Sequence, residues 1–168
     1  MSELYIITGP AGVGKSTISR KIAEQKNKSV LVEGDDIYHQ VISGYKSAWE
    51  KGNHLQVFWK ICENMIDTYL SYDYDVIFNY IFNVENFQTF NEKFKKYSKK
   101  FVILVTDEET IVKRDLERPL DCQMGERSLI LLRSFKNKPF DKKYYLDTSN
   151  LSIEETVCEI ESNNSYIF

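Results

Sequence analysis

The feature that most constrains this sequence is the segment G-P-A-G-V-G-K-S at residues 9–16. It fits the pattern G-x-x-x-x-G-K-[ST] at every position. The apolar run from Leu4 to Thr8 precedes it with the composition of a buried strand, and we expect a helix over residues 15–25. In such a strand–loop–helix unit, glycines let backbone N–H groups and the helix N-terminus surround a phosphate group. The segment therefore predicts a loop that binds a nucleoside triphosphate.

The rest of the chain alternates between strand-like and helix-like segments. Apolar residues recur with a helical period over residues 57–69 and 85–97, and a last helix is expected over 153–160 with Ser152 at its N-cap. The alternation predicts an α/β fold in which helices cover both faces of a parallel sheet. Within the 168 residues we find no repeat or low-complexity linker, so we expect one domain, 1–168. Short apolar runs predict four further strands, at residues 29–33, 76–80, 101–105 and 144–148.

Composition narrows the classes of partner. The chain has 22 Lys and Arg against 25 Asp and Glu, a net charge of −3. Duplex-binding domains normally carry a basic excess, so we do not expect a nucleic-acid partner. We find neither a signal-peptide pattern nor 18 consecutive apolar residues, and the three cysteines are far apart without metal-ligand spacing. We therefore expect a cytoplasmic protein with reduced thiols and no membrane partner, and the sequence does not indicate an oligomeric state.

The loop residues predict how the nucleotide is held. Lys15 has the position to reach the β- and γ-phosphates, and the Ser16 hydroxyl the position to bind Mg²⁺. Thr17 is expected to contact the α-phosphate. ATP and Mg²⁺ are thus the expected ligands. The predicted nucleotide-binding residues of the loop are Gly9, Pro10, Ala11, Gly12, Val13, Gly14, Lys15, Ser16 and Thr17.

Carboxylates cluster at the end of the second predicted strand, in E-G-D-D-I-Y-H from Glu33 to His39. Since carboxyl ends of adjacent strands converge on the ligand crevice, we expect Glu33 and Asp35 to face the phosphates or a nearby acceptor. A carboxylate there accepts a hydroxyl proton or holds Mg²⁺-bound water. Asp36 has a simpler alternative role, as the cap of the following helix.

The ends of the apolar runs also bear on the class of P-loop protein. Motor, switch and AAA-type P-loop proteins are usually larger and carry an aspartate at the end of an apolar strand. Here the runs are followed by Glu33, Asn79 and Thr106. This pattern favours another branch of P-loop proteins.

Three segments resemble the small P-loop metabolite kinases, such as the gluconate, shikimate, adenylylsulfate and chloramphenicol kinases. They are GPAGVGKST, the E-G-D-x-x-x-H stretch, and an arginine-rich stretch over residues 113–127. The resemblance covers most of the chain. It implies the P-loop NTPase three-layer sandwich, with a five-stranded parallel sheet in the order 2-3-1-4-5. It also implies a mobile lid at about 118–127 and an acceptor-binding region at about 37–74.

The resemblance assigns roles to the acidic residues. Asp35 would bind or deprotonate the acceptor hydroxyl, and Glu33 would lie near the metal, although relatives usually have Asp at that position. The metal site would then comprise Ser16 and Glu33. His39 would line the acceptor pocket. Asn79 departs from the pattern, because relatives commonly carry Asp at the end of that strand.

The same resemblance assigns roles to three arginines. Arg114 and Arg118 would bind the nucleotide, and Arg127 would clamp the transferring phosphoryl group; planar guanidinium suits both tasks. Catalysis would therefore rest on Lys15, Asp35 and Arg127. The alternative for each arginine is a surface ion pair with a neighbouring carboxylate. The segment 147–149 resembles the loop that touches the adenine edge in these kinases.

Three functions remain open on the sequence. The first is an ATP-dependent kinase, gluconate-kinase-like, that phosphorylates a hydroxyl of a small metabolite or antibiotic. The second is a nucleotide-binding regulatory P-loop ATPase without a small acceptor. The third is a kinase of nucleic-acid 5′-hydroxyl ends, which the isoelectric point near 5.5 disfavours. The aromatic and imidazole side chains of the acceptor region include Tyr38, Tyr45, Trp49, His54 and Trp59.

Overall fold

The protein is described by a computed structural model that covers residues 2–168. Its centre is a five-stranded sheet in which every pairing is parallel, in the order β2-β3-β1-β4-β5. This is the order 2-3-1-4-5 expected from the sequence, so the predicted fold class is confirmed. The strands are β1 (Glu3–Thr8), β2 (Ser29–Glu33), β3 (Asp75–Asn79), β4 (Ser98–Val105) and β5 (Tyr145–Asp147).

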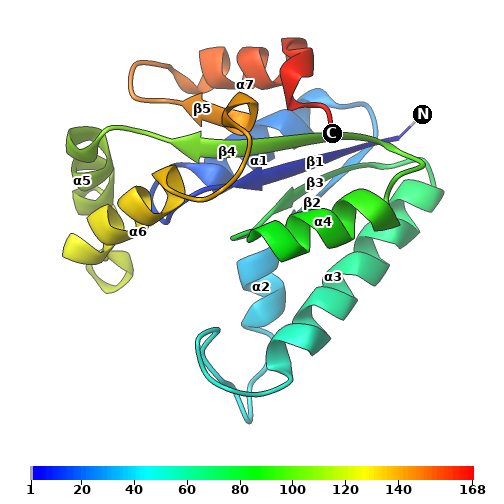
Figure 1. The fold of residues 1–168 in the computed structure, drawn as a ribbon, viewed down its shortest axis with the longest axis horizontal. Helices are drawn as coiled ribbons and strands as arrows, with labels where there is room; N and C mark the ends of the chain where they lie inside the picture. Colours follow the sequence, from blue (N-terminus) through cyan, green and yellow to red (C-terminus); the bar gives the residue numbers. More distant parts are fainter. Residues whose placement is uncertain (1) are drawn as a thin grey trace.

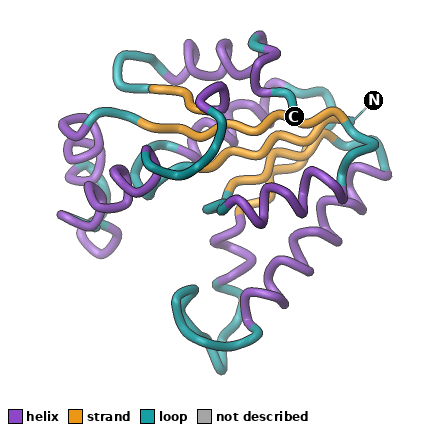
Figure 2. Tube along the Cα trace, in the orientation of Figure 1, coloured by secondary structure: helices purple, strands orange, loops and turns teal. Residues whose placement is uncertain are grey.

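Helices cover both faces of the sheet (Figures 1 and 2). The helices are α1 (Lys15–Gln25), α2 (Gly34–Tyr38), α3 (His54–Ser71), α4 (Val84–Lys93), α5 (Glu108–Leu116), α6 (Glu126–Lys136) and α7 (Ile153–Ser162). On one face of the sheet the first helix, α1, packs against the last helix, α7. On the other face, aromatic side chains of α3 and α4 pack against each other and against β3. Two more helices extend beyond the carboxyl end of β4.

The core forms where the apolar strands lie between the helical layers. Because parallel sheets are covered on both faces, the apolar residues of β1, β3 and β4 are almost completely buried. On the side of α3 and α4, Phe78 of β3 stacks on Phe90, and Trp59 packs edge-on against both. Trp59, which was expected in the acceptor region, therefore belongs to the core.

Local sequence explains most helix ends. The Ser152 hydroxyl accepts a hydrogen bond from Glu155 N, and the Glu155 carboxylate accepts one from Ser152 N, which confirms the predicted cap of α7. The helix expected over 85–97 ends earlier, at Lys93, because Phe94 turns into the core against Phe90. Asp36 lies within the first turn of α2, so the alternative that it caps this helix is wrong.

Within residues 2–168, the helices are all too short or too polar to cross a bilayer.

Candidate active site

The loop between β1 and α1 depends on glycine at three positions. Gly9, Gly12 and Gly14 have φ angles of 147°, 82° and 101°. A Cβ atom at Gly9 would lie 2.4 Å from the carbonyl oxygen of Leu104, so any larger residue would push the loop away from β4. Gly14 immediately precedes α1, which leaves the first N–H groups of that helix free to face an anion.

Lys15 folds back over this loop. Its ammonium donates hydrogen bonds to the carbonyl oxygens of Gly9 (3.1 Å) and Pro10 (2.9 Å). Loss of hydration lowers the pKa of Lys15 to about 8; the Asp35 carboxylate opposes this shift and the Arg118 guanidinium adds to it. The loop thus presents a lysine that is short of counter-charge and whose present partners are neutral carbonyls.

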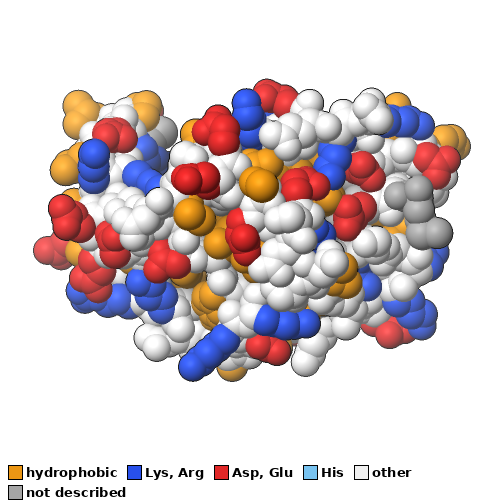
Figure 3. Space-filling model, turned by 90° about the horizontal axis from the view of Figure 1, so that it is seen from above, with side chains coloured by type: hydrophobic (Ala, Val, Ile, Leu, Met, Phe, Trp, Pro, Cys, Tyr) orange, Lys and Arg blue, Asp and Glu red, His pale blue; other side chains and the backbone are white. Residues whose placement is uncertain are grey.

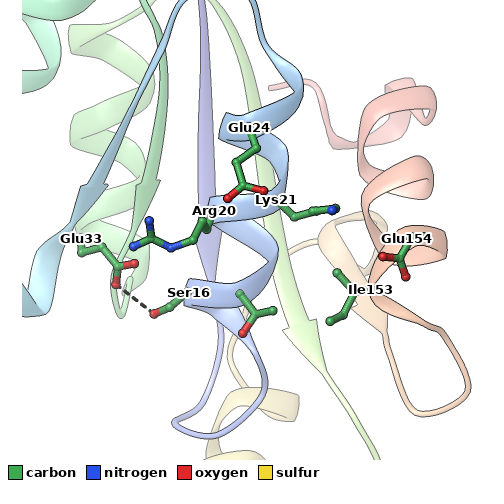
Figure 4. A pocket seen from close by; sticks show the side chains of 8 residues that line it. Ser16, Arg20, Lys21, Glu24, Glu33, Ile153 and Glu154 are labelled. Atoms are coloured by element: carbon green, nitrogen blue, oxygen red, sulfur yellow. Dashed lines mark hydrogen bonds between the residues drawn. The ribbon is translucent and has the colours of Figure 1, made fainter.

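Ser16 and Glu33 meet at the carboxyl end of β2. The Ser16 hydroxyl donates a hydrogen bond of 2.9 Å to Glu33 Oε2, and Figure 4 shows this contact beside the hollow between α1 and α7. Residues 2–168 contain no cluster of three or more His, Cys, Asp or Glu side chains that would hold a metal. Mg²⁺ needs no such cluster, because it is commonly held by one or two protein oxygens and by substrate phosphates. A hydroxyl and a carboxylate at hydrogen-bond distance fit that requirement.

A crevice of about 290 Å³ brings together predicted residues from three separate segments. Asp35 faces the loop from α2, Arg114 approaches from α5, and Arg118 approaches from the segment that follows α5. Gly34 makes this position of Asp35 possible, because a Cβ atom there would lie 2.5 Å from the ring of Tyr80. We call this the phosphate crevice; it is lined by Ala11, Gly12, Gly14, Lys15, Ser16, Thr17, Asp35, Arg114 and Arg118.

Arg114 joins the loop to the segment after β5. Its guanidinium donates to Val13 O (3.1 Å), to Thr148 Oγ1 (3.2 Å) and to Thr148 O (3.2 Å). The same residues border a second pocket of about 410 Å³ that continues the phosphate crevice along α1. Thr148, from the segment expected at the adenine edge, lines it together with Leu151 and Ile153.

Asp115 is the residue that sequence reasoning missed. It is 2% exposed, and its carboxylate accepts hydrogen bonds from Met124 N (2.9 Å) and Gly125 N (2.7 Å). It also lies 3.4 Å from Arg118 Nη1. One buried carboxylate thereby holds both ends of the expected lid, 118–127. From the sequence, Asp115 was expected only as a possible ion-pair partner of one of the three arginines.

Arg127, at the far end of that segment, lies outside the phosphate crevice. Its guanidinium carbon lies 5.1 Å above the ring of Trp49, in the segment between α2 and α3. Arg114 and Arg118 are thus brought to the loop, whereas Arg127 contacts the predicted acceptor region.

The remaining predicted residues take different places. His39 is exposed and stacks on Tyr45, with ring centroids 5.9 Å apart. Asn79 is buried at the end of β3 beside Glu33, and its Nδ2 atom has no hydrogen-bond partner within residues 2–168.

The sequence profile of a family described as an AAA domain matches residues 4–130. This match is consistent with the expected resemblance to small P-loop metabolite kinases. No curated protein sequence matches the chain.

Solved structures share the fold at low sequence identity. The tunicamycin resistance protein of Deinococcus radiodurans aligns with a TM-score of 0.71 over 96% of this chain and 95% of that chain, at 15% identity. A gluconokinase from Sinorhizobium meliloti 1021 aligns with a TM-score of 0.68 over 94% and 89%, at 16% identity. A chain of the Pnkp1/Rnl/Hen1 RNA repair complex aligns with a TM-score of 0.64 over 83% and 46%, at 23% identity. The shared fold is that of small P-loop kinases.

Proposed function

The chain belongs to this AAA-domain family of P-loop proteins, and on that premise we propose that it transfers the γ-phosphoryl group of ATP to a hydroxyl group of a small molecule. The proposal rests on one observation: the Asp35 carboxylate lines the same crevice as the phosphate loop and two arginines. A protein that only binds a nucleotide has no need of a carboxylate across the crevice from its phosphate loop. An ATPase can use such a carboxylate to activate water, so acceptor-dependent release of ADP is what separates transfer from hydrolysis. The fold that the chain shares with a gluconokinase supports the proposal of a gluconate-kinase-like phosphotransferase.

Each group in the crevice has a chemical task in the proposed reaction. Lys15 exchanges its two carbonyl partners for phosphate oxygens, a stronger contact because both groups are charged. The N-terminus of α1 and the guanidinium of Arg118 carry further positive charge to the same place. These groups hold the triphosphate where negative charge accumulates during transfer.

Asp35 acts on the acceptor. The hydroxyl oxygen of the acceptor forms a bond to the γ-phosphorus, while the bond from that phosphorus to the β–γ bridging oxygen breaks and ADP leaves. The hydroxyl proton passes to the Asp35 carboxylate and then to solvent. Ser16 and Glu33 are the residues placed to hold Mg²⁺, which neutralises phosphate charge when it is bound.

We also propose that residues 1–168 form one kinase unit that works in the cytoplasm. Cys62 and Cys158 are free thiols, which agrees with a reducing compartment.

A second candidate is phosphorylation of nucleic-acid 5′-hydroxyl ends, favoured by the likeness to a chain of an RNA repair complex. Charge counts against it, because the chain carries −3 overall. On the face seen in Figure 3, acidic and basic side chains are interspersed instead of forming a basic field. We therefore keep the small acceptor as the proposal.

The decisive experiment is a screen for ADP formation by the purified protein. The panel contains sugar acids, nucleosides, shikimate-like acids, aminoglycoside and phenicol antibiotics, and a 5′-hydroxyl RNA oligonucleotide. Acceptor-dependent ADP release with a small molecule, and none with RNA, is the expected result. The RNA alone being phosphorylated would replace the proposal with the second candidate.

Lys15→Ala serves as the test of the site in the same assay. We expect it to abolish transfer and to weaken ATP binding at least about tenfold, because the loop loses its ammonium. Lys95→Ala removes an exposed lysine paired with Glu92 and is the matched control. Unchanged ATP affinity and turnover in Lys15→Ala would refute the proposed function.

A further inference from the structure

A further cavity lies between α2 and α3, in the part of the fold that projects below the sheet in Figure 1. Its volume is about 200 Å³. That is smaller than the roughly 300–1,000 Å³ of sites for drug-sized ligands, so it suits a body of about one ring. We call it the apolar cavity; it is lined by Ile37, Tyr38, Val41, Gly44, Tyr45, Lys46, His54, Val57, Phe58 and Ile61.

The entrance to the apolar cavity is built from half-exposed apolar side chains. Val57 and Ile61 lie one turn apart on α3 and are 52% and 45% exposed. Val41 and Tyr45, from the segment after α2, are 49% and 46% exposed. Apolar side chains that line a cavity and remain exposed gain about 25 cal/mol per Å² when an apolar ligand covers them. The cavity therefore favours an apolar occupant.

His54 is the one imidazole among the residues that line this cavity. Both ring nitrogens are buried and have no hydrogen-bond partner within residues 2–168. Leaving such a donor or acceptor unpaired costs about 1–3 kcal/mol, which a ligand with one matching polar group would recover. The ring of Tyr38 packs edge-on against His54, with centroids 6.3 Å apart, and so fixes one side of the imidazole.

The apolar cavity and the phosphate crevice are lined by neighbouring residues of α2. Tyr38 lines the cavity and follows Asp35 by three residues, or about 4.5 Å along the helix axis. Tyr80, which follows β3, lies between lining residues of the two sites: its ring contacts Phe58 at 4.5 Å between centroids and lies against Gly34, next to Asp35. Burial and the nearby Asp35 carboxylate both raise the pKa of the Tyr80 hydroxyl, which stays a neutral donor beside the acceptor.

We propose that the acceptor is a neutral, largely apolar alcohol of one ring, with its hydroxyl near Asp35 and one polar substituent directed at His54. This inference rests on the proposed function and goes beyond it, because it names the substrate class. The ring would fill the apolar cavity between Tyr38, Phe58 and Ile61.

The residues that line the apolar cavity exclude a sugar acid as its ligand. A sugar acid presents a carboxylate and several hydroxyls, each of which needs a partner once it leaves water. The single Lys or Arg of the lining is Lys46, and its ammonium already donates to the carbonyl oxygen of Lys51. Most other lining groups are hydrocarbon, so a sugar acid would lose its hydration without replacement.

The first test compares acceptors. The probes are 2-(4-hydroxyphenyl)ethanol, 2-phenylethanol, gluconate and ribose, with ADP release as the readout. We expect kcat/KM for 2-(4-hydroxyphenyl)ethanol to exceed that for gluconate and ribose at least about tenfold. Preference for gluconate or ribose would overturn the inference and leave the phosphotransferase proposal standing.

The second test uses variants of the cavity. His54→Phe keeps the ring and removes both nitrogens, so the preference for the 4-hydroxylated alcohol over 2-phenylethanol should fall about tenfold. Val57→Lys places a charge at the entrance and should remove alcohol binding, measured by calorimetry without ATP. Val112→Lys, the same substitution at a partly exposed valine of α5, is the control.

Calorimetry also separates the two proposals. Binding of 2-(4-hydroxyphenyl)ethanol that Val57→Lys removes and Val112→Lys retains supports the apolar cavity, even if no acceptor in the panel stimulates ADP release. In that case only the phosphotransferase proposal fails. Absence of binding, or binding unaffected by Val57→Lys, overturns the inference.

Discussion

At the scale of single residues, the phosphate loop and α2 oppose each other across a narrow crevice. The ammonium of Lys15 is held by two carbonyl oxygens, and the Asp35 carboxylate is near enough to raise its pKa against the effect of lost hydration. Asp35 itself is exposed and therefore accessible to a hydroxyl group. The two residues therefore serve different partners: one the nucleotide, the other the acceptor.

Asp35→Asn tests this division. The amide keeps the shape of the side chain but accepts no proton, so we expect transfer to fall about 10²-fold or more while ATP still binds. Steady-state ADP release and ATP calorimetry measure the two effects. Asp36→Asn, at the adjacent exposed position of α2, is the control and should change turnover little. Wild-type turnover in Asp35→Asn would show that Asp35 has no part in the chemistry.

At the scale of elements, α5, α6 and the segment between them form one unit around a buried carboxylate. Asp115 accepts from two backbone N–H groups at the start of α6 and pairs with Arg118. Gly125 adopts a φ of 55°, a conformation that favours glycine, so the chain can turn sharply there into α6. This unit brings Arg114 of α5 and Arg118 of the following segment to the phosphate loop.

Asp115→Ala should loosen this unit. It leaves Met124 N and Gly125 N without their acceptor, at a cost of about 1–3 kcal/mol. Hydrogen exchange over residues 118–125 should become faster, and Arg118 should lose its fixed position, which raises KM for ATP. Asp121→Ala, an exposed change in the same segment, is the control. Equal exchange rates in both variants would contradict the anchoring role.

Arg127→Ala tests the other end of the same unit. If Arg127 clamps the transferring phosphoryl group in a closed state, kcat should fall about 10²-fold or more with little change in ATP affinity. The structure supplies the matched variant: Trp49→Leu removes the ring on which Arg127 now stacks and keeps the guanidinium. An equal fall in kcat for both variants would instead assign Arg127 to the acceptor region, through Trp49.

At the scale of the whole molecule, the two ends of the sheet have separate tasks. The carboxyl ends of β1, β2 and β3 lead to the phosphate crevice, and the opposite end carries stabilising polar contacts. There Lys26 pairs with Glu161 at 2.7 Å, and the buried Lys100 ammonium donates to Ile160 O at the end of α7. A cation at that position also suits the helix dipole.

The dependence of stability on pH follows from buried lysines. Burial lowers the pKa of Lys138, beside Phe82 O and the Phe135 ring, to about 8. Because the unfolded lysine binds its proton up to a pKa of roughly 10.4, the unfolded state holds more protons above pH 8, and this group's contribution to stability rises with pH. The lowered pKa of Lys15 likewise makes stability rise with pH. Burial raises the pKa of the Cys62 thiol to about 12, so the contribution of this group to stability falls as pH rises.

Lys138→Met isolates one of these effects. The free energy of unfolding of the ATP-free protein is measured by chemical denaturation at pH 7.5 and 9.5. The value for the variant minus the value for wild type should fall by about 1–2 kcal/mol between these two pH values. Lys136→Met, at an exposed position of α6, should show no such change. A pH-independent difference between Lys138→Met and wild type would contradict the lowered pKa.

Much of the fold was predictable because its determinants are local. Strand β2 has the bounds expected from its apolar run, and the cap of α7 at Ser152 follows from a hydroxyl three residues before a glutamate. The sheet order followed from the resemblance of three segments to the small P-loop metabolite kinases. The assignment of Asp36 as a cap was wrong because α2 begins directly after β2 and leaves no separate capping position.

The sequence alone therefore determined the phosphate loop, the parallel sheet and the candidate residues that follow its strands, because backbone conformation and hydrophobic period are set by neighbours along the chain. The tertiary structure decided which side chains meet. It placed Trp59 in the core, Arg127 on Trp49, Asp115 beneath the α5–α6 segment and His54 in an apolar cavity. These contacts join residues that are distant in sequence or turn a side chain toward one of several neighbours. Packing between elements chooses among such contacts, and no local pattern records that choice.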